Sequence, residues 1–196
     1  ATSDGSVDTA TLLTSGEGNF TASLAAFELF GYAVAGIGDV DGDGVPDLAV
    51  GAPGYSRLRG AVYVVLLAED GSAKSVTRVH DLVTADLAAY DHFGAALCGV
   101  GDVDGDGVRD VAVGAWGDDA DSSTTGAFYI LFLAADGSAS RYVKMGGTEL
   151  AAAGYAGVLE EYGEFGSSIA LLSDEGFFPF SLAVGAPGTS AANPGG

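Results

Sequence analysis

Basic side chains are scarce in this chain. Only 7 Lys and Arg stand against 27 Asp and Glu, which gives a formal net charge of −20 over 196 residues. Phosphate contacts need Lys and Arg, so this charge argues against nucleic acid and against an anionic membrane surface as partners. Bound divalent cations would offset part of this negative charge. Nearly half of the residues are hydrophobic, so the chain is no disordered acidic tail and has enough apolar surface for a folded core.

Cysteine, long apolar runs and helical periodicity are also lacking. The single cysteine, Cys98, excludes an internal disulfide, and the small apolar residues around it indicate a buried thiol. No stretch reaches about 18 apolar residues, so direct membrane insertion is not expected. The only histidines, His80 and His92, have no partners at a spacing typical of a catalytic triad. The chain is therefore not expected to be an enzyme.

Three short patterns recur along the chain and define a repeat of about 65 residues. Each unit has a Phe-Gly pair preceded by an aromatic residue, then Gly-Ala-Pro or a near copy, and each hairpin has Asp-Gly-Ser at its turn. Copies of one pattern lie 63 to 72 residues apart. The Phe-Gly pairs begin at Phe30, Phe93 and Phe165, and the aromatic residues before them are Phe27, Tyr90 and Tyr162. The Gly-Ala-Pro copies begin at Gly51, Gly114 and Gly185. The Asp-Gly-Ser turns begin at Asp4, Asp70 and Asp136.

Each unit is typical of antiparallel β-structure. Residues 60–69 and 126–135 are rich in β-branched and aromatic residues and end at Asp-Gly-Ser, and a polar alternating segment follows, which predicts a hairpin. The small-residue runs before each hairpin suit strands that are buried on both faces. The sequence therefore predicts an all-β chain, built from four-stranded antiparallel units that stack as the blades of a β-propeller.

Two loops, 39–47 and 102–110, have four aspartates at the same spacing. Each offers carboxylates at positions 1, 3, 5 and 9, a glycine for a sharp turn at position 6 and a backbone carbonyl at position 7. This all-oxygen set suits Ca²⁺, whereas Zn²⁺ would favour the Cys or His that both loops lack. Position 12 is Val50 or Val113, where an EF-hand needs Glu. An acidic turn without metal is the alternative.

The combination of Phe-Gly, D-x-D-x-D-G-x-x-D and Gly-Ala-Pro resembles the FG-GAP repeats of the integrin α-subunit β-propeller and of related bacterial and algal surface proteins. The resemblance covers essentially all of 1–196 as one propeller segment. It divides into 1–29, an outer strand of a preceding blade and a linker, then repeat 1 (30–92), repeat 2 (93–164) and a partial repeat 3 (165–196). It implies two Ca²⁺ sites, formed by Asp39, Asp41, Asp43, Asp47 and the carbonyl of Val45, and by Asp102, Asp104, Asp106, Asp110 and the carbonyl of Val108.

The third repeat departs from this pattern. Glu175, Gly176 and Phe177 follow Asp174, so no cation site is expected there. Two full blades and partial ones form an incomplete ring, because propellers close with about four to eight blades. We therefore expect a fragment of a larger propeller, a protomer that completes its ring with other chains, or an open stack of blades in an assembly.

The residues predict calcium binding and propeller blades. The resemblance to integrin α implies a module of an extracellular or cell-surface protein, used for adhesion or for protein–protein assembly with other chains or with remaining blades. The alternatives are a structural subunit of an extracellular fibre or large complex, and an accessory or lectin-like domain of a longer enzyme, for which a glycan is the expected ligand.

Three other features point to surface loops. Asn19 begins a glycosylation sequon, which would be used if the chain is secreted. Asp118, Asp119 and Asp121 are expected in a solvated loop. Trp116 stands where the other two copies have proline, and it either packs between blades or is exposed for a partner.

Overall fold

The computed structural model describes residues 10–83, 85–118, 125–173 and 181–188. The expectations for Asp4, Asp119, Asp121 and the segment 174–180 fall outside this part. The strands of the described residues are β1 (Val34–Gly38), β2 (Asp47–Gly51), β3 (Val62–Leu67), β4 (Ala73–Val79), β5 (Ala96–Gly101), β6 (Asp110–Ala115), β7 (Ala127–Leu133), β8 (Ala139–Met145), β9 (Ile169–Ser173) and β10 (Ser181–Val184). The helical segments are α1 (Tyr55–Leu58), α2 (Gly147–Leu150) and η1 (Ala151–Tyr155).

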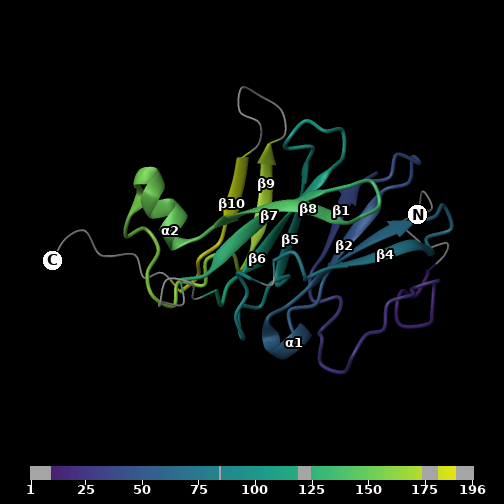
Figure 1. Cartoon of the computed structure of the whole chain (residues 1–196), viewed down its shortest axis with the longest axis horizontal. Coiled ribbons are helices and arrows are strands. Elements are labelled where there is room, and N and C mark those ends of the chain that lie inside the picture. The colour runs from purple at the N-terminus through teal and green to yellow at the C-terminus, as the bar shows by residue number, and fades with distance from the viewer. Residues whose placement is uncertain (1–9, 84, 119–124, 174–180, 189–196) are drawn as a thin grey trace, which may run out of the picture.

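The strands form two complete antiparallel sheets and one partial sheet (Figure 1). The complete sheets have the orders β1-β2-β3-β4 and β5-β6-β7-β8, and β9 pairs with β10. Their registers match, since Leu48 pairs with Val65 in the first sheet as Val111 pairs with Leu131 in the second. The all-β prediction of four-stranded antiparallel units is therefore confirmed, twice in full and once in part.

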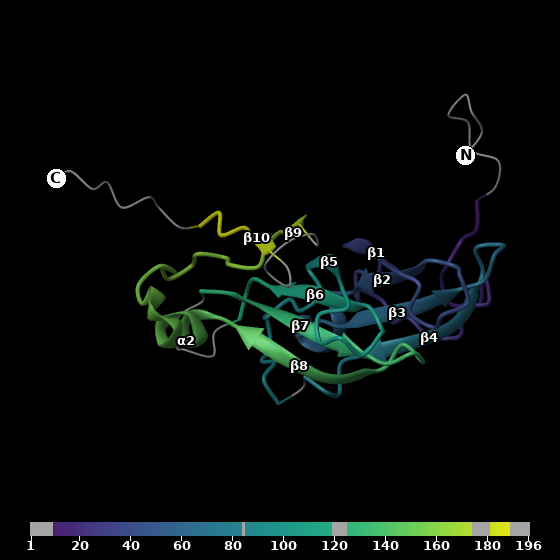
Figure 2. The same cartoon turned by 90° about the horizontal axis from the view of Figure 1, so that it is seen from above.

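The main hydrophobic core lies between the two complete sheets, which are seen from above in Figure 2. Alternate residues of β3 serve two cores. Val62, Val64 and Leu66 belong to the main core, whereas Tyr63 and Val65 belong to a cluster on the opposite face. β7 alternates in the same way between the main core and a third cluster that includes residues of β9 and β10. Because successive side chains of a strand point to opposite faces, these continuous apolar runs pack on both faces of each sheet.

Residues 10–30 cover the face of the first sheet that points away from the second. Phe20 is 2% exposed. Its ring packs edge-on against Phe30, with 5.0 Å between the centroids, and lies 6.2 Å from the ring of Tyr63. This segment therefore supplies apolar cover that a neighbouring sheet would otherwise provide.

Hairpin tips contact the segment that precedes them in the stack. Thr77 Oγ1, in β4, donates to the carbonyl oxygen of Asp136 at the tip of the second hairpin, and Thr11 Oγ1 donates to that of Asp70 at the first tip. Thr11 therefore lies where the outermost strand of a preceding unit would lie. Among the described residues before β1, the only bridge joins Thr14 to Glu17. The outer strand assigned to 1–29 stays a prediction, as do the repeat boundaries.

The glycines of the Phe-Gly pairs allow the units to approach closely. Gly94 and Gly166 have φ of 90° and 89°, which disfavours a side chain. A Cβ at Gly94 would lie 2.5 Å from the carbonyl oxygen of Ala61, and one at Gly166 would lie 2.1 Å from that of Ala127. Gly31 has a similar φ of 88°, but a Cβ there would meet nothing within 4 Å. The later two glycines are therefore needed both for the turn and for contact with the preceding unit.

Three expectations about the fold need correction. The thiol of Cys98, in β5, was expected to be buried and is only half-buried. Full burial holds for β6, but Val34 in β1 is 58% exposed, because β1 is an edge strand of its sheet. The helical turns at 147–155 were not expected, since they are too short for a hydrophobic period. The N–H of Gly146 donates to Glu149 Oε2 at their start. No helix in the described ranges has the length and apolar character needed to cross a bilayer.

Candidate metal centre

The two aspartate loops occupy equivalent places in the two complete sheets. The first joins β1 to β2, and the second joins β5 to β6. Strand pairing fixes the ends of each loop, because Gly38 pairs with Asp47 and Gly101 pairs with Asp110. Both loops therefore emerge at the end of the sheet opposite to the Phe-Gly and Gly-Ala-Pro segments.

The first aspartate of each loop organises the loop backbone. Asp39 Oδ1 accepts hydrogen bonds from the N–H groups of Gly42 (2.8 Å) and Asp43 (3.1 Å), and its Oδ2 accepts from Gly44 (2.8 Å). Asp102 accepts the same three bonds 63 residues later. Gly42 and Gly44 have φ of 77° and 90°, a backbone region that glycine adopts without strain. The glycines thus let the chain fold around the carboxylate.

Three carboxylates of each loop gather in one place. One oxygen from each of Asp39, Asp41 and Asp43 lies within 4.8 Å of the others, and Asp102, Asp104 and Asp106 form the same group in the second loop. Among the described residues, these are the two groups of three or more potential ligands of this kind. The structure therefore brings together three of the four predicted carboxylates at each loop.

The fourth carboxylate, Asp47 or Asp110, is buried behind the loop. Asp47 Oδ2 accepts from the N–H of Val40 and Oδ1 from that of Leu67, both at 2.8 Å, and Asp110 has equivalent partners. Burial raises the pKa of Asp47 above its ordinary value, the two N–H donors oppose this, and the charges of Asp41 and Asp43 raise it further. The charges of the loop therefore affect the pKa of Asp47. Each of its oxygens has a second lone pair, so a role as ligand stays a prediction.

The oxygen-only donor set fits a hard divalent cation, with Ca²⁺ as the best match to several carboxylates on a flexible loop. A cation bound there would neutralise part of the repulsion among the aspartates. The N–H of Val45 donates to Asp43 Oδ1, and that of Val108 to Asp106 Oδ1, both at 2.8 Å. The ligand role of the Val45 and Val108 carbonyls remains a prediction.

Basic side chains from the outer strands reach both loops, which the sequence analysis missed. Lys74, in β4, contacts Asp41 and Asp43, each at 2.5 Å. Arg141, in β8, contacts Asp104 at 2.9 Å. Hydrogen bonds with Asp41 and Asp43 raise the pKa of Lys74, and its bond to Asp43 lowers the pKa of that carboxyl. Both residues follow a hairpin turn that lies beside the loop. Their place just after Asp-Gly-Ser was the sequence signal from which these contacts could have been predicted.

Asp118 corrects the expectation of a solvated loop after Trp116. Its side chain is only 4% exposed. Its carboxylate accepts a 2.8 Å hydrogen bond from the hydroxyl of Tyr129 and forms an ion pair of 2.8 Å with Lys144. Burial raises the pKa of Tyr129, and the charge of Asp118 raises it further. The acid is therefore part of the sheet packing at this end of the second unit.

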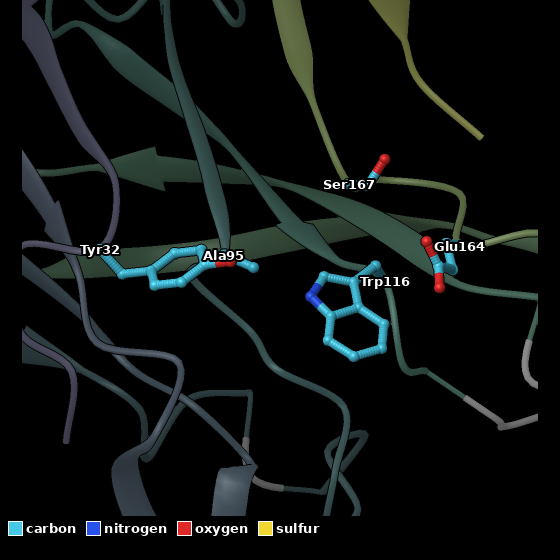
Figure 3. A pocket seen from close by; sticks show the side chains of 5 residues that line it. All are labelled: Tyr32, Ala95, Trp116, Glu164 and Ser167. Atoms are coloured by element: carbon cyan, nitrogen blue, oxygen red, sulfur yellow. The ribbon is translucent and has the colours of Figure 1, made fainter. Parts of the chain in front are cut away.

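Trp116 lines a hollow between the loops of successive units (Figure 3). The hollow has a volume of about 250 Å³ and is bounded by Tyr32, Ala95, Trp116, Glu164 and Ser167. The Trp116 ring stacks on His92, with 4.1 Å between centroids and 12° between planes. Burial lowers the pKa of His92. Trp116 is thus half-buried, packed on one ring face and accessible from the hollow.

Comparison with known proteins agrees with these features. The FG-GAP repeat family matches residues 30–65, which include the first aspartate loop. The chain is 42% identical over 88 residues to integrin alpha pat-2 of Caenorhabditis elegans and 40% identical over 89 residues to integrin alpha-M of Mus musculus. The matches cover 44% and 45% of this chain but only 7% and 8% of those proteins. The chain therefore contains a segment that matches the FG-GAP repeat, and it is similar to integrin alpha chains over almost half of its length.

Proposed function

We propose that this chain is a calcium-stabilised propeller module of an extracellular or cell-surface protein that takes part in adhesion or protein–protein assembly. The observation that carries the proposal is the pair of matching carboxylate groups, one in each complete sheet, with the same hydrogen bonds inside each loop. The similarity to integrin alpha chains supports the adhesion part. The module has no catalytic function in this proposal.

The ligands follow the loop positions. Asp39, Asp41, Asp43, Asp47 and the Val45 carbonyl hold the first Ca²⁺. The second ion is held by Asp102, Asp104, Asp106, Asp110 and the Val108 carbonyl. The cation adds stability because it binds the folded loop and not the unfolded chain. It therefore fixes the turn between the two inner strands of each unit.

Calorimetric titration of the whole chain with CaCl₂ tests this proposal. The expected stoichiometry is two for the chain and one for either Asp43→Ala or Asp106→Ala. A stoichiometry of zero, or one that neither substitution changes, overturns the two sites.

The contact surface for a partner is proposed at the end of the sheets that carries the Phe-Gly pairs. The aromatic residue three positions before each pair is exposed there: Phe27 by 89%, Tyr90 by 66% and Tyr162 by 66%. All three have positive φ, between 62° and 77°, which costs backbone energy for a residue with a side chain. Exposed aromatic side chains are frequent contributors to binding energy at interfaces.

The same aromatic residues support the second candidate, a lectin-like or accessory domain with a glycan ligand. A glycan array separates the candidates. Signals that disappear in Phe27→Ala and Tyr90→Ala favour the lectin, whereas a protein recovered at fixed stoichiometry favours adhesion or a structural subunit. Asn19 is exposed at a turn with φ of 58°. Its modification by a glycan in a secreted protein is part of the proposal, and mass measurement before and after glycosidase tests it.

A further inference from the structure

The basic partners of the two aspartate loops differ, although the loops themselves match. Lys74 Nζ lies 2.5 Å from Oδ2 of Asp41 and 2.5 Å from Oδ2 of Asp43. Arg141 contacts its loop through Asp104. We propose that Lys74 is a built-in competitor of the cation, which makes the first loop bind a divalent cation more weakly than the second. This inference rests on the cation sites proposed above.

Lys74 contacts oxygens that the cation also needs. Asp43 Oδ1 accepts the N–H of Val45, and Asp41 Oδ1 accepts the N–H of Asp43 at 3.3 Å. The Oδ2 atoms of Asp41 and Asp43 are those that contact the ammonium group. An ammonium ion and a divalent cation cannot both lie at contact distance from these atoms, because like charges repel. Lys74 must therefore leave both carboxylates before the first loop binds a cation.

The second loop has a weaker competitor. Arg141 lies over the ring of Phe132, with 3.4 Å from its guanidinium carbon to the centroid, so a cation–π contact holds it as well as Asp104. Among the ion pairs of the described residues, none includes Asp106. A cation at this loop has to displace one ionic contact instead of two.

The difference comes from side chains and not from the backbone. Ala73 pairs with Leu67 in the first hairpin as Ala139 pairs with Leu133 in the second. Ser140 therefore occupies in β8 the position that Lys74 occupies in β4. A serine has no positive charge to compete with a cation, so exchange of these two residues should exchange the behaviour of the loops.

The test measures one loop at a time by calorimetric titration of the whole chain with CaCl₂. In an Asp106→Ala background, Lys74→Met should raise the affinity of the first loop about two- to fivefold, since an exposed ion pair changes an equilibrium by up to about fivefold. Arg57→Met removes the same charge on the opposite end of the sheet, so it should change the affinity less than about twofold. In an Asp43→Ala background, Ser140→Lys should weaken the second loop.

Melting in chelator supplies a second readout. Lys74→Met should lower the melting temperature there, because Asp41 and Asp43 lose their counter-charge, while its Ca²⁺ affinity rises. A purely structural role would reduce both. Unchanged or reduced affinity in Lys74→Met, or no weakening in Ser140→Lys, overturns this inference alone. No binding by the unsubstituted chain overturns the cation sites and the inference together.

Discussion

The hydroxyl group of Tyr129 donates a hydrogen bond of 2.8 Å to Oδ2 of Asp118, and both residues are buried. An equivalent bond of 3.0 Å joins Tyr63, 66 residues earlier, to Glu28 Oε2. The tyrosines share a place in the third strand of their sheets, but Glu28 precedes the first strand of its sheet and Asp118 follows the second strand of the other. The tyrosine is thus the repeated partner, and a different loop supplies the acid in each unit.

Removal of the Tyr129 hydroxyl should destabilise the fold. In Tyr129→Phe, the buried Asp118 loses one donor and keeps Lys144, so we expect the free energy of unfolding to fall by about 1–3 kcal/mol. Urea denaturation measures this change. Tyr142→Phe is the matched control, because the bond from Tyr142 goes to the exposed Asp86. A loss in Tyr129→Phe no larger than in the control would contradict the structural role of the buried bond.

Calcium should stabilise the chain in two separable increments. At a free concentration one hundred times the dissociation constant, each site adds about 2.7 kcal/mol to the free energy of unfolding. Asp43→Ala should lose the increment of the first loop, and Asp106→Ala that of the second. Each protein is denatured with Ca²⁺ and with chelator, so that effects of the substitution itself cancel. Equal stability in the two solutions for the unsubstituted chain would rule out calcium stabilisation.

Alanine at Gly94 should cost more than alanine at Gly31. Both residues have φ near 90°, so both substitutions strain the backbone by about 1–2 kcal/mol. Only Gly94 also brings a Cβ to 2.5 Å from a carbonyl oxygen of the preceding unit, that of Ala61, and overpacking adds about 1–3 kcal/mol. Denaturant unfolding in chelator compares the two variants. An equal loss of stability in the two variants would show that the close approach of the units does not contribute to the free energy of unfolding.

The fluorescence of Trp116 should report the protonation of His92. Trp116 is the only tryptophan of the chain, and its ring stacks on the imidazole. Burial lowers the pKa of His92 below its ordinary 6.5, so the neutral ring is favoured in the fold. Its contribution to stability is therefore present above pH 6.5 and is lost as the pH falls through the lowered pKa.

An emission titration should then show a step with a midpoint below 6.5. His92→Gln is the control and should remove the step, because glutamine does not titrate in this range. A step that persists in His92→Gln, or a midpoint above 6.5, would assign the change to another group.

The strands and loops could be predicted because their signals are local. β3 and β7 are rich in β-branched and aromatic residues, and each is followed by an Asp-Gly-Ser turn in which Gly71 or Gly137 adopts positive φ. The aspartate loops could be predicted for the same reason, because nearby residues of the loop itself bring Asp39, Asp41 and Asp43 together.

Contacts between distant segments could not be read from the sequence. Lys74 is 31 residues from Asp43, and only the pairing of the hairpin with the inner strands places it over the loop. The burial of Asp118 depends on Tyr129 and Lys144 in two later strands. An acidic run has the same local appearance whether it is solvated or paired, so its environment follows from tertiary packing alone.

The contact between a hairpin tip and the segment before it has an evolutionary consequence. Thr11 meets Asp70 as Thr77 meets Asp136, with 59 residues between the partners in both pairs. Because the same contact recurs with the same spacing, each junction depends only on the two segments that form it and not on units farther away. Duplication or deletion of one whole unit would recreate a junction that already exists, whereas loss of half a unit would leave a hairpin tip without its threonine. Gene rearrangements in whole units are therefore the changes of length that such a chain tolerates.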